Sequence, residues 1–350
     1  TAADPLCGGA LYAHIAYARQ LDIKRAVILD ALRRIGRLEL PGDIRLAASP
    51  EEGYRMRARL HVRAGRIGFF REGTHGICDA RATRQLLPQS CDALEGLGAA
   101  LQSPGADAVR EVELSENVDA SQRVVALDAA PPLEARVVER LGTSIAAGGL
   151  SGVVSGAHVH GVPFVVDRVQ PGGHSIELRR HVLAFFQGNR HLLGGLVAHV
   201  VAQLPENGTV VELYAGVGLF SVAAAVARGA RVTAVEGDRV AASDLEANAS
   251  ASGAAIRPVH DSVERFVLRR LSDPPLAVVV DPPRTGLSRE ALDGAIDLRP
   301  RRIVYVSCDV ATLARDARRI IDAGFAVSGA AAFDLFPNTP HVETVLVFDR

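Results

Sequence analysis

The sequence predicts a two-part protein in which a mostly parallel α/β sheet, covered by helices on both faces, follows a smaller α+β domain. From about residue 176 onward, short apolar strands alternate with helices, and a glycine-rich turn joins one strand to an alanine-rich helix. The first part of the chain shows strands of alternating polarity instead. We place the boundary near residue 180, with an α+β domain at 1–180 and an α/β domain at 181–350.

Composition limits the possible classes of protein. The chain has 350 residues, enough for two domains with separate cores, and 48% of them are hydrophobic. The net charge of -1 argues against a globally basic nucleic-acid binder, so any such contact must be local. No apolar run is long enough to span a membrane, and no signal peptide is recognisable. The cysteines, which do not suggest a disulfide scaffold, are Cys7, Cys78, Cys91 and Cys308. We expect a cytoplasmic monomer.

The first part begins with an amphipathic segment that predicts a helix from about Leu11 to Ile35. Its expected apolar face consists of Leu11, Ile15, Ile23, Val27 and Leu32. A strand at 54–63, a turn and a second strand at 67–70 follow. Alternation places Tyr54, Met56, Leu60 and Val62 on one face of the first strand, and on the other face Arg55, Arg57, Arg59, His61 and Arg63. Such a basic face can follow a nucleic-acid backbone or can simply be solvated, and the pattern favours neither.

The second part reads as a succession of helices and short apolar strands. A helix is expected at 190–204, and strands at 209–213, 231–236, 276–280, 302–307 and 343–348. In an open sheet of this kind, ligands bind outside the carboxyl ends of the strands. The residues that directly follow the strands are therefore the candidates for chemistry.

A glycine-rich turn follows the first of these strands. Gly216 and Gly218 let a ligand approach the backbone, and the helix that follows offers free N–H groups. Glu236 ends the next strand, where a carboxylate can accept both hydroxyls of a ribose. The third glycine of a dinucleotide-binding fingerprint is missing, which disfavours NAD. The pattern predicts a cofactor of the nucleoside type.

Three further segments place reactive side chains near the same edge. Asp281-Pro-Pro-Arg284 follows an apolar strand, and its prolines fix the backbone at the rim of the cleft. Cys308 follows the next strand and begins a helix, where we expect its thiolate to be favoured, as suits a nucleophile. Glu343 stands at the start of the last strand.

These segments, in this order, resemble the RNA 5-methyluridine methyltransferase family, whose cofactor is S-adenosylmethionine. The resemblance covers most of the chain and includes Phe185-Phe-Gln187-Gly-Asn189, Asp281-Pro-Pro-Arg, Ser307-Cys308 and Pro-Asn-Thr-Pro-His-Val-Glu343. It implies a Rossmann-like class I methyltransferase domain after a smaller α+β RNA-binding domain. It also implies that Cys308 is the nucleophile and Glu343 the base, and that the cofactor and base pocket is lined by Gln187, Tyr214, Gly216, Gly218, Glu236, Asp261 and Asp281.

The chemistry explains these residue types. Carbon 5 of uracil is too weak a nucleophile to take a methyl group unaided, so a thiolate adds to carbon 6 first, and a base later removes the carbon 5 proton. The target uridine must leave its stack to reach such a pocket. We expect a uridine of 23S ribosomal RNA as the substrate, with the T-loop uridine of transfer RNA as the alternative. A cytosine C5 methyltransferase and a non-catalytic RNA-binding or folding factor are the other hypotheses.

Two departures from the family's pattern affect cofactors and partners. Many members hold an iron–sulfur cluster with four cysteines, including a Cys-Gly-Gly-Cys segment. This chain has Cys7-Gly-Gly-Ala10 there, and Thr83 is the residue that we match to the later position, so we expect no cluster and no other metal. The family's small N-terminal RNA-binding barrel is not found in these residues, which fits either a compact lineage or a shortened chain.

Overall fold

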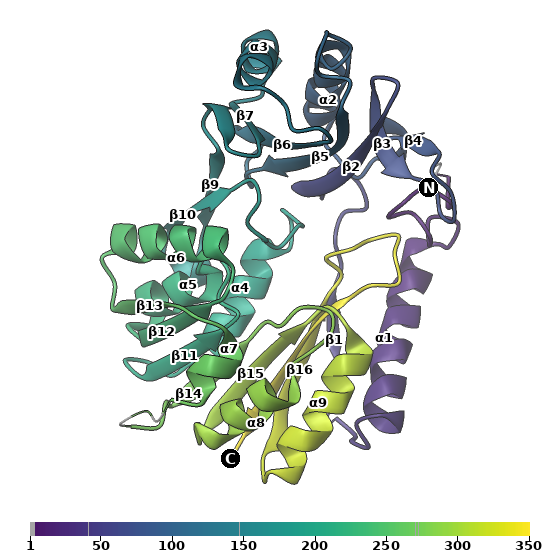
Figure 1. Cartoon of the computed structure of the whole chain (residues 1–350). Coiled ribbons are helices and arrows are strands. Elements are labelled where there is room, and N and C mark those ends of the chain that lie inside the picture. Colours follow the sequence, from purple (N-terminus) through teal and green to yellow (C-terminus); the bar gives the residue numbers. More distant parts are fainter. Residues whose placement is uncertain (1–3, 41, 147, 270, 272) are drawn as a thin grey trace.

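The computed structural model describes residues 4–40, 42–146, 148–269, 271 and 273–350. The chain forms a large α/β domain and a smaller α+β domain, which lies at the top of Figure 1. An antiparallel ribbon of β9 (Phe164–Val169) and β10 (Ile176–His181) connects them. The predicted fold class is confirmed. Within the described part of the chain, no helix is long and apolar enough to cross a membrane.

The large domain is built on an eight-stranded sheet with the strand order β1-β16-β17-β15-β14-β11-β12-β13. Strands β11 to β15 are parallel, and β17 is antiparallel to both of its neighbours. Their bounds are β1 Arg45–Ala47, β11 Thr209–Leu213, β12 Arg231–Glu236, β13 Ile256–His260, β14 Ala277–Val280, β15 Arg302–Ser307, β16 Ala326–Phe333 and β17 Glu343–Asp349. The five strands predicted for this part are therefore present.

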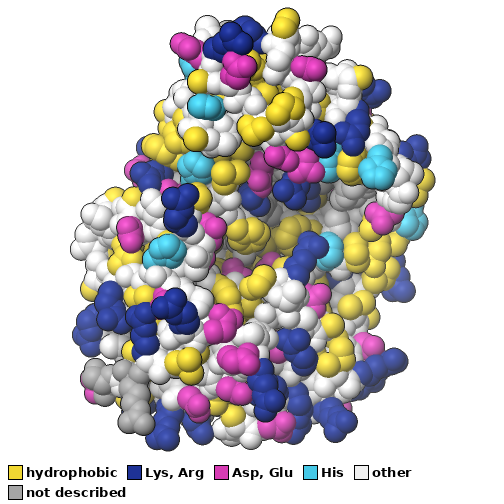
Figure 2. All heavy atoms as spheres, in the orientation of Figure 1, with side chains coloured by type: hydrophobic (Ala, Val, Ile, Leu, Met, Phe, Trp, Pro, Cys, Tyr) yellow, Lys and Arg dark blue, Asp and Glu magenta, His cyan; other side chains and the backbone are white. Residues whose placement is uncertain are grey.

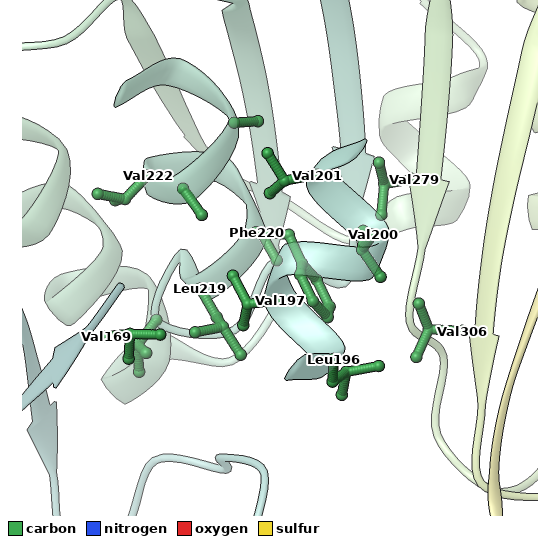
Figure 3. Packing of buried hydrophobic residues seen from close by; sticks show 14 of the residues in the cluster. Val169, Leu196, Val197, Val200, Val201, Leu219, Phe220, Val222, Val279 and Val306 are labelled. Atoms are coloured by element: carbon green, nitrogen blue, oxygen red, sulfur yellow. The ribbon is translucent and has the colours of Figure 1, made fainter. Parts of the chain in front are cut away.

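Helices cover both faces of this sheet because successive strand residues point to opposite sides. Val210 and Val279 pack with α4 (Leu193–Ala202), α5 (Leu219–Arg228) and α6 (Arg239–Ser252). Figure 3 shows α4 and α5 side chains meeting Val279 on that face. The neighbouring residues Val211 and Val280 pack on the other face with α1 (Tyr17–Arg34), α7 (Val263–Val267), α8 (Arg289–Asp297) and α9 (Val310–Asp322).

The first helix differs from its prediction in start and orientation. Helix α1 begins at Tyr17 rather than near Leu11, because the preceding segment forms turns and the N–H of Tyr12 donates to the carbonyl of Asn338. The predicted apolar face is confirmed at Leu32 and wrong at Val27, which is 49% exposed. The buried residues are Gln20, Lys24, Ile28 and Leu32. Strand β1 belongs to the large sheet and α1 packs against it, although both lie in the segment assigned to the first domain.

The small domain is a seven-stranded sheet with the order β4-β3-β2-β5-β6-β7-β8, and α2 and α3 pack against its apolar residues. Its strands are β2 Arg57–Arg63, β3 Arg66–Phe70, β4 Ile77–Asp79, β5 Val109–Glu116, β6 Arg123–Ala129, β7 Gly152–Ser155 and β8 His158–Gly161. Its helices are α2 Pro88–Ala100 and α3 Ala135–Ala146, and two short 3-10 turns, η1 Arg81–Thr83 and η2 Pro171–Gly173, complete the fold.

The alternation predicted for the first strand of this domain is confirmed. Tyr54, Met56, Leu60 and Val62 are buried. On the opposite face, however, β5 supplies acidic partners for the basic residues. Arg57 pairs with Glu113, and Arg59 pairs with Glu111 at 3.0 Å. Part of the basic face is thus neutralised within the sheet.

A disulfide, which we did not expect from the sequence, joins Cys7 to Cys78 of β4, with a Cα–Cα distance of 5.9 Å. Ala10 packs against it in a small buried cluster. Thr83 was matched to the later cluster position, but its hydroxyl donates to the carbonyl of Ala80, and it is Cys78 that lies beside Cys7. Among the described residues, no group of three or more His, Cys, Asp or Glu side chains could hold a metal ion.

The absence of an iron–sulfur cluster remains a prediction. We expect anaerobically purified protein to be colourless and to methylate RNA without added iron, because Ala10 cannot provide the thiolate that a cluster needs. Elemental analysis and the visible spectrum measure this directly. Stoichiometric iron with absorbance near 400 nm would contradict the prediction, whereas aerobic and anaerobic preparations with equal activity would agree with it.

Candidate active site

The register of the large sheet brings the ends of its central strands together. Leu213 of β11 lies beside Val280 of β14, so the glycine-rich turn and Asp281 leave the sheet side by side. In the antiparallel pair of β15 and β17, Ser307 lies opposite Thr344. Cys308 and Glu343 are the next residues beyond this last pair, and the charge of Glu343 acts on the Cys308 thiol. All the motifs that the sequence singled out, except the first-domain strand, end at this edge.

The glycine-rich turn has a backbone that suits the approach of a ligand. Tyr214, Gly216 and Gly218 all have positive φ angles, of 62°, 55° and 91°. A Cβ built on Gly216 would meet nothing within 4 Å, so this side of the turn is open. Behind the turn, Glu212 is buried and accepts a hydrogen bond from Ser221, and burial raises the pKa of Glu212 to about 8.

Glu236 lies at the end of β12, directly beside this turn. Its Oε2 accepts a hydrogen bond from the N–H of Gly216 at 2.7 Å, and its Oε1 accepts one from the N–H of Asp238 at 2.7 Å. Each carboxylate oxygen can accept a further hydrogen bond, so Glu236 can hold two hydroxyls while it also orders the turn. This arrangement suits a ribose.

Gln187 and Asp281 form the next part of the site. The side-chain amide of Gln187 donates to Oδ2 of Asp281 at 3.1 Å, across two elements that are far apart in the sequence. Burial raises the pKa of Asp281 to about 7, although the hydrogen bond from Gln187 acts in the opposite direction. A buried carboxyl group with this pKa can accept or donate a hydrogen bond near neutral pH.

Cys308 follows β15, and Asp309 caps α9 by accepting a hydrogen bond from the N–H of Thr312 at 2.8 Å. The expectation of a favoured thiolate is wrong for this environment. Burial, followed by the negative charges of Glu343 and Asp281, raises the pKa of the Cys308 thiol to about 11. Arg284 acts in the opposite direction through a hydrogen bond and its charge. Burial, together with two nearby carboxyl groups, therefore outweighs the effect expected of the helix N-terminus.

Glu343 is the first residue of β17 and is almost completely buried. Among the described residues, its Oε1 atom has no hydrogen-bond partner. Burial, followed by the charge of Asp281, raises the pKa of Glu343 well above its usual value, while Arg284 lowers it. A buried carboxyl oxygen without a partner is costly, which indicates a functional role for the residue.

The structure also shows which predicted residues are less well placed, and which were missed. Asp261 lies next to Glu236 through a backbone hydrogen bond, but its carboxylate is paired with Arg265 and Arg269 of α7 and the adjoining turn. Its cofactor contact remains a prediction.

Phe185 was quoted only as part of a motif, yet its side chain is 62% exposed, two residues before Gln187. An exposed aromatic residue beside a site of this kind can stack on a base.

A hollow lies between the two domains, with the small domain above it and the large domain below it in Figure 2. Apolar, acidic and basic side chains all reach the hollow, and Arg57 from the small domain lies over the Phe185 ring at 5.8 Å. Residues from both domains therefore lie close together at the site. The site therefore combines an open glycine-rich turn and the Glu236 carboxylate, which suit a nucleoside, with a buried cysteine and carboxyl group at the same edge of the sheet.

Comparison with known proteins identifies the family. The family model described as tRNA (Uracil-5-)-methyltransferase matches residues 159–350. The 23S rRNA (uracil(1939)-C(5))-methyltransferase of Halomonas elongata is 31% identical over 98% of this chain and 75% of its own length. An uncharacterized RNA methyltransferase of Corynebacterium efficiens is 30% identical over 97% of this chain and 76% of its own.

A solved structure agrees with the fold. The tRNA (uracil-54, C5)-methyltransferase of Pyrococcus abyssi, crystallised with S-adenosyl-L-homocysteine, has a TM-score of 0.75 over 99% of this chain and 86% of its own, at 24% identity. This chain belongs to the tRNA (uracil-5-)-methyltransferase family. It is an S-adenosylmethionine-dependent methyltransferase that acts on carbon 5 of uracil in RNA, which confirms the enzyme class and the cofactor expected from the sequence.

The residues present fit this cofactor. The open side of the turn at Gly216 leaves room for a ligand against the backbone, and Glu236 provides the ribose acceptor. Gln187 and Asp281 lie on the side of the site towards Cys308. When bound, S-adenosylmethionine supplies an electrophilic methyl group on its sulfonium.

Loss of the Glu236 carboxylate should weaken cofactor binding. A charged acceptor contributes about 1.5–3 kcal/mol, so Glu236→Ala should raise the Kd for S-adenosylmethionine by roughly one to two decades in isothermal titration calorimetry. Glu246→Ala, which removes an exposed carboxylate from α6, is the matched control and should not change the Kd. If Glu236→Ala bound the cofactor as tightly as the wild type, the pocket would lie elsewhere.

Proposed function

We propose that this enzyme methylates carbon 5 of a uridine in 23S ribosomal RNA through a covalent adduct between Cys308 and carbon 6, with Glu343 as the base. The observation that carries this proposal is the buried pair at the ends of β15 and β17. There, Glu343 keeps a carboxyl oxygen without a partner among the described residues, close enough to Cys308 for its charge to act on the thiol. No other role for that oxygen is evident in the contacts of the described chain.

The reaction would proceed in two stages. The Cys308 thiolate bonds to carbon 6, and the electrons of the 5,6 double bond move onto the oxygen at carbon 4, so that carbon 5 becomes nucleophilic and takes the methyl group. Glu343 then removes the proton from carbon 5. The electrons left behind restore the double bond and expel Cys308 as a thiolate. Because Arg284 lowers the pKa of both groups, it favours the ionised forms that these steps require.

Relatives and the small domain support the choice of ribosomal RNA. The Halomonas elongata relative, similar along nearly the whole chain, carries a 23S rRNA name. On the basic face of the small domain, Arg55 and Arg63 have no ion-pair partner among the described residues, and their guanidinium groups lie 5.6 Å from the Phe69 and Phe70 rings. Uncompensated arginines beside aromatic rings suit phosphates and unstacked bases.

A transfer assay with two RNAs tests this choice. Unmodified 23S rRNA and unmodified tRNA, both transcribed in vitro, would be incubated with the enzyme and methyl-labelled cofactor, then digested and analysed by mass spectrometry. We expect 5-methyluridine at one position of the 23S rRNA and background labelling of the tRNA. Labelling of the tRNA alone would favour the alternative substrate. The appearance of 5-methylcytidine, or of no methylated pyrimidine in either RNA, would contradict the proposed reaction.

A further inference from the structure

Three polar side chains of α1, Tyr17, Gln20 and Lys24, make hydrogen bonds to one distant loop. This loop, residues 334–342, joins β16 to β17 and ends immediately before Glu343. In Figure 1 it rises from the edge of the large sheet beside the upper end of α1. We call it the β16–β17 loop.

Lys24 makes the most unusual of these contacts. It is the only lysine of the chain, and it is 1% exposed. Its Nζ donates to Oδ1 of Asp334 at 2.5 Å and to the carbonyl of Phe336 at 3.0 Å. All other cations of the Lys and Arg type in this chain are arginines, and at this buried position a compact ammonium stands where a planar guanidinium would need more room.

Two further residues of α1 hold the same loop. The hydroxyl of Tyr17 donates to Oδ2 of Asp334 at 2.9 Å, so both carboxylate oxygens of this fully buried aspartate are engaged. The amide of Gln20 pairs with Asn338 in both directions, because its Nε2 donates to Oδ1 of Asn338 and its Oε1 accepts from the N–H of Asn338, each at 2.9 Å.

The other side of the β16–β17 loop is tied to the segment that carries Gln187. The Asn189 side chain donates to the carbonyl of Leu335 at 3.1 Å and to Oγ of Ser49 at 2.8 Å, and Asn189 is completely buried. Because Tyr17 also accepts a hydrogen bond from the N–H of Ser49, at 2.8 Å, a continuous hydrogen-bond network joins α1 to both segments.

This network has an energetic cost that packing alone does not explain. Burial lowers the pKa of Lys24, and the charge of Asp334 acts in the opposite direction. A buried ion pair contributes little net stability compared with apolar residues of similar volume, so its retention suggests a requirement for a defined geometry. The geometry that it defines is that of the loop ending at Glu343, since Phe333 and Glu343 pair across the base of that loop.

We propose that Lys24, Gln20 and Tyr17 are positioning residues for the methyl-transfer reaction, which fix the β16–β17 loop and so aim the Glu343 carboxylate at the carbon 5 proton. This inference rests on the proposed function, because it takes Glu343 as the base. A displacement of about 1 Å in a catalytic group can reduce a rate by about a hundredfold. The loss of the Lys24 contacts therefore affects proton removal more than cofactor binding or adduct formation.

The test compares Lys24→Met with Arg25→Met. The first removes the buried ammonium at nearly constant length; the second removes a half-exposed cation from the adjacent position of the same helix. Active sites would be counted by covalent trapping on RNA that contains 5-fluorouridine, so that kcat is expressed per competent site. We expect Lys24→Met to retain the wild-type Kd for S-adenosylmethionine, to lower kcat by about ten- to hundredfold, and to accumulate a protein–RNA adduct on ordinary RNA. Arg25→Met should behave as the wild type.

The outcomes separate this inference from the proposed function. If Lys24→Met has the wild-type kcat per trapped site, its role is structural only and the positioning inference is overturned, whatever the change in Tm. If wild-type enzyme forms no adduct at all, it is the proposed function that fails. Should Lys24→Met not fold, Tyr17→Phe removes only one hydroxyl from the network. Tyr17→Phe should accumulate the protein–RNA adduct on ordinary RNA, but less of it than Lys24→Met. A wild-type kcat per trapped site in Tyr17→Phe would overturn the inference.

Discussion

The Glu343→Gln enzyme is expected to stop after methyl transfer, with the methylated RNA still bonded to Cys308. Glutamine keeps the shape of the side chain in its buried site, but it is not a useful base near neutral pH. Adduct formation and methyl transfer need no proton acceptor at carbon 5, so both should still occur. Only the elimination that releases Cys308 should fail.

Denaturing electrophoresis with ordinary RNA and methyl-labelled cofactor measures this result. A labelled protein–RNA band that disappears after nuclease treatment is the expected outcome for Glu343→Gln. Asp349→Asn, at the other end of β17, is the matched control, because it neutralises a carboxylate that pairs with Arg302 away from the site. That control should release free product. Release of methylated RNA by Glu343→Gln at near the wild-type rate would remove Glu343 from the role of base.

Replacement of the nucleophile should have an even larger effect. Cys308→Ser should lower kcat/KM by about 10⁶-fold, the size of the loss when a protease loses its nucleophile. Cys91→Ser is the matched control, since Cys91 is the other free cysteine and is buried in the core of the small domain. Steady-state methyl transfer measures both variants. An activity of Cys308→Ser within tenfold of the wild type would rule out attack by Cys308.

The same assignment predicts the pH dependence of the wild-type enzyme. The pKa of Cys308 is raised to about 11, so most molecules carry the unreactive thiol at pH 7, and the thiolate fraction grows about tenfold per pH unit below that pKa. The pKa of Glu343 is also raised, and the base must be ionised to accept a proton. A higher pH therefore increases the active form of Glu343 as well as that of Cys308. We therefore expect kcat/KM to rise with pH between 7 and 9. A flat or falling profile would contradict this assignment.

The sequence predicted the site well where the signal was local. Cys308, Asp281 and Glu343 each stand directly at the end of an apolar strand, and the alternation of strands and helices sets all three at one edge of a sheet. The pattern of Gly216 and Gly218 before a helix likewise needed no long-range information, because positive φ angles at a strand-to-helix turn favour glycine.

The sequence failed where a residue's environment came from distant segments. The predicted apolar face of the first helix did not include Gln20 and Lys24, because their partners Asn338 and Asp334 are 318 and 310 residues away. The thiol of Cys308 was expected to ionise easily at a helix N-terminus, yet its burial, followed by the charges of Glu343 and Asp281 from two other strand ends, raises its pKa. The disulfide of Cys7, whose partner is 71 residues away, was missed for the same reason.

The most direct test of the account is covalent trapping on RNA that contains 5-fluorouridine. Fluorine at carbon 5 leaves no removable proton, so the adduct cannot break down by elimination. The account predicts that wild-type enzyme with S-adenosylmethionine forms a stable protein–RNA complex. After protease and nuclease digestion, mass spectrometry should find a methylated fluorouridine on the peptide that contains Cys308, and Cys308→Ser should form no complex. A complex that persists in Cys308→Ser, or a label on any other residue, would contradict the account.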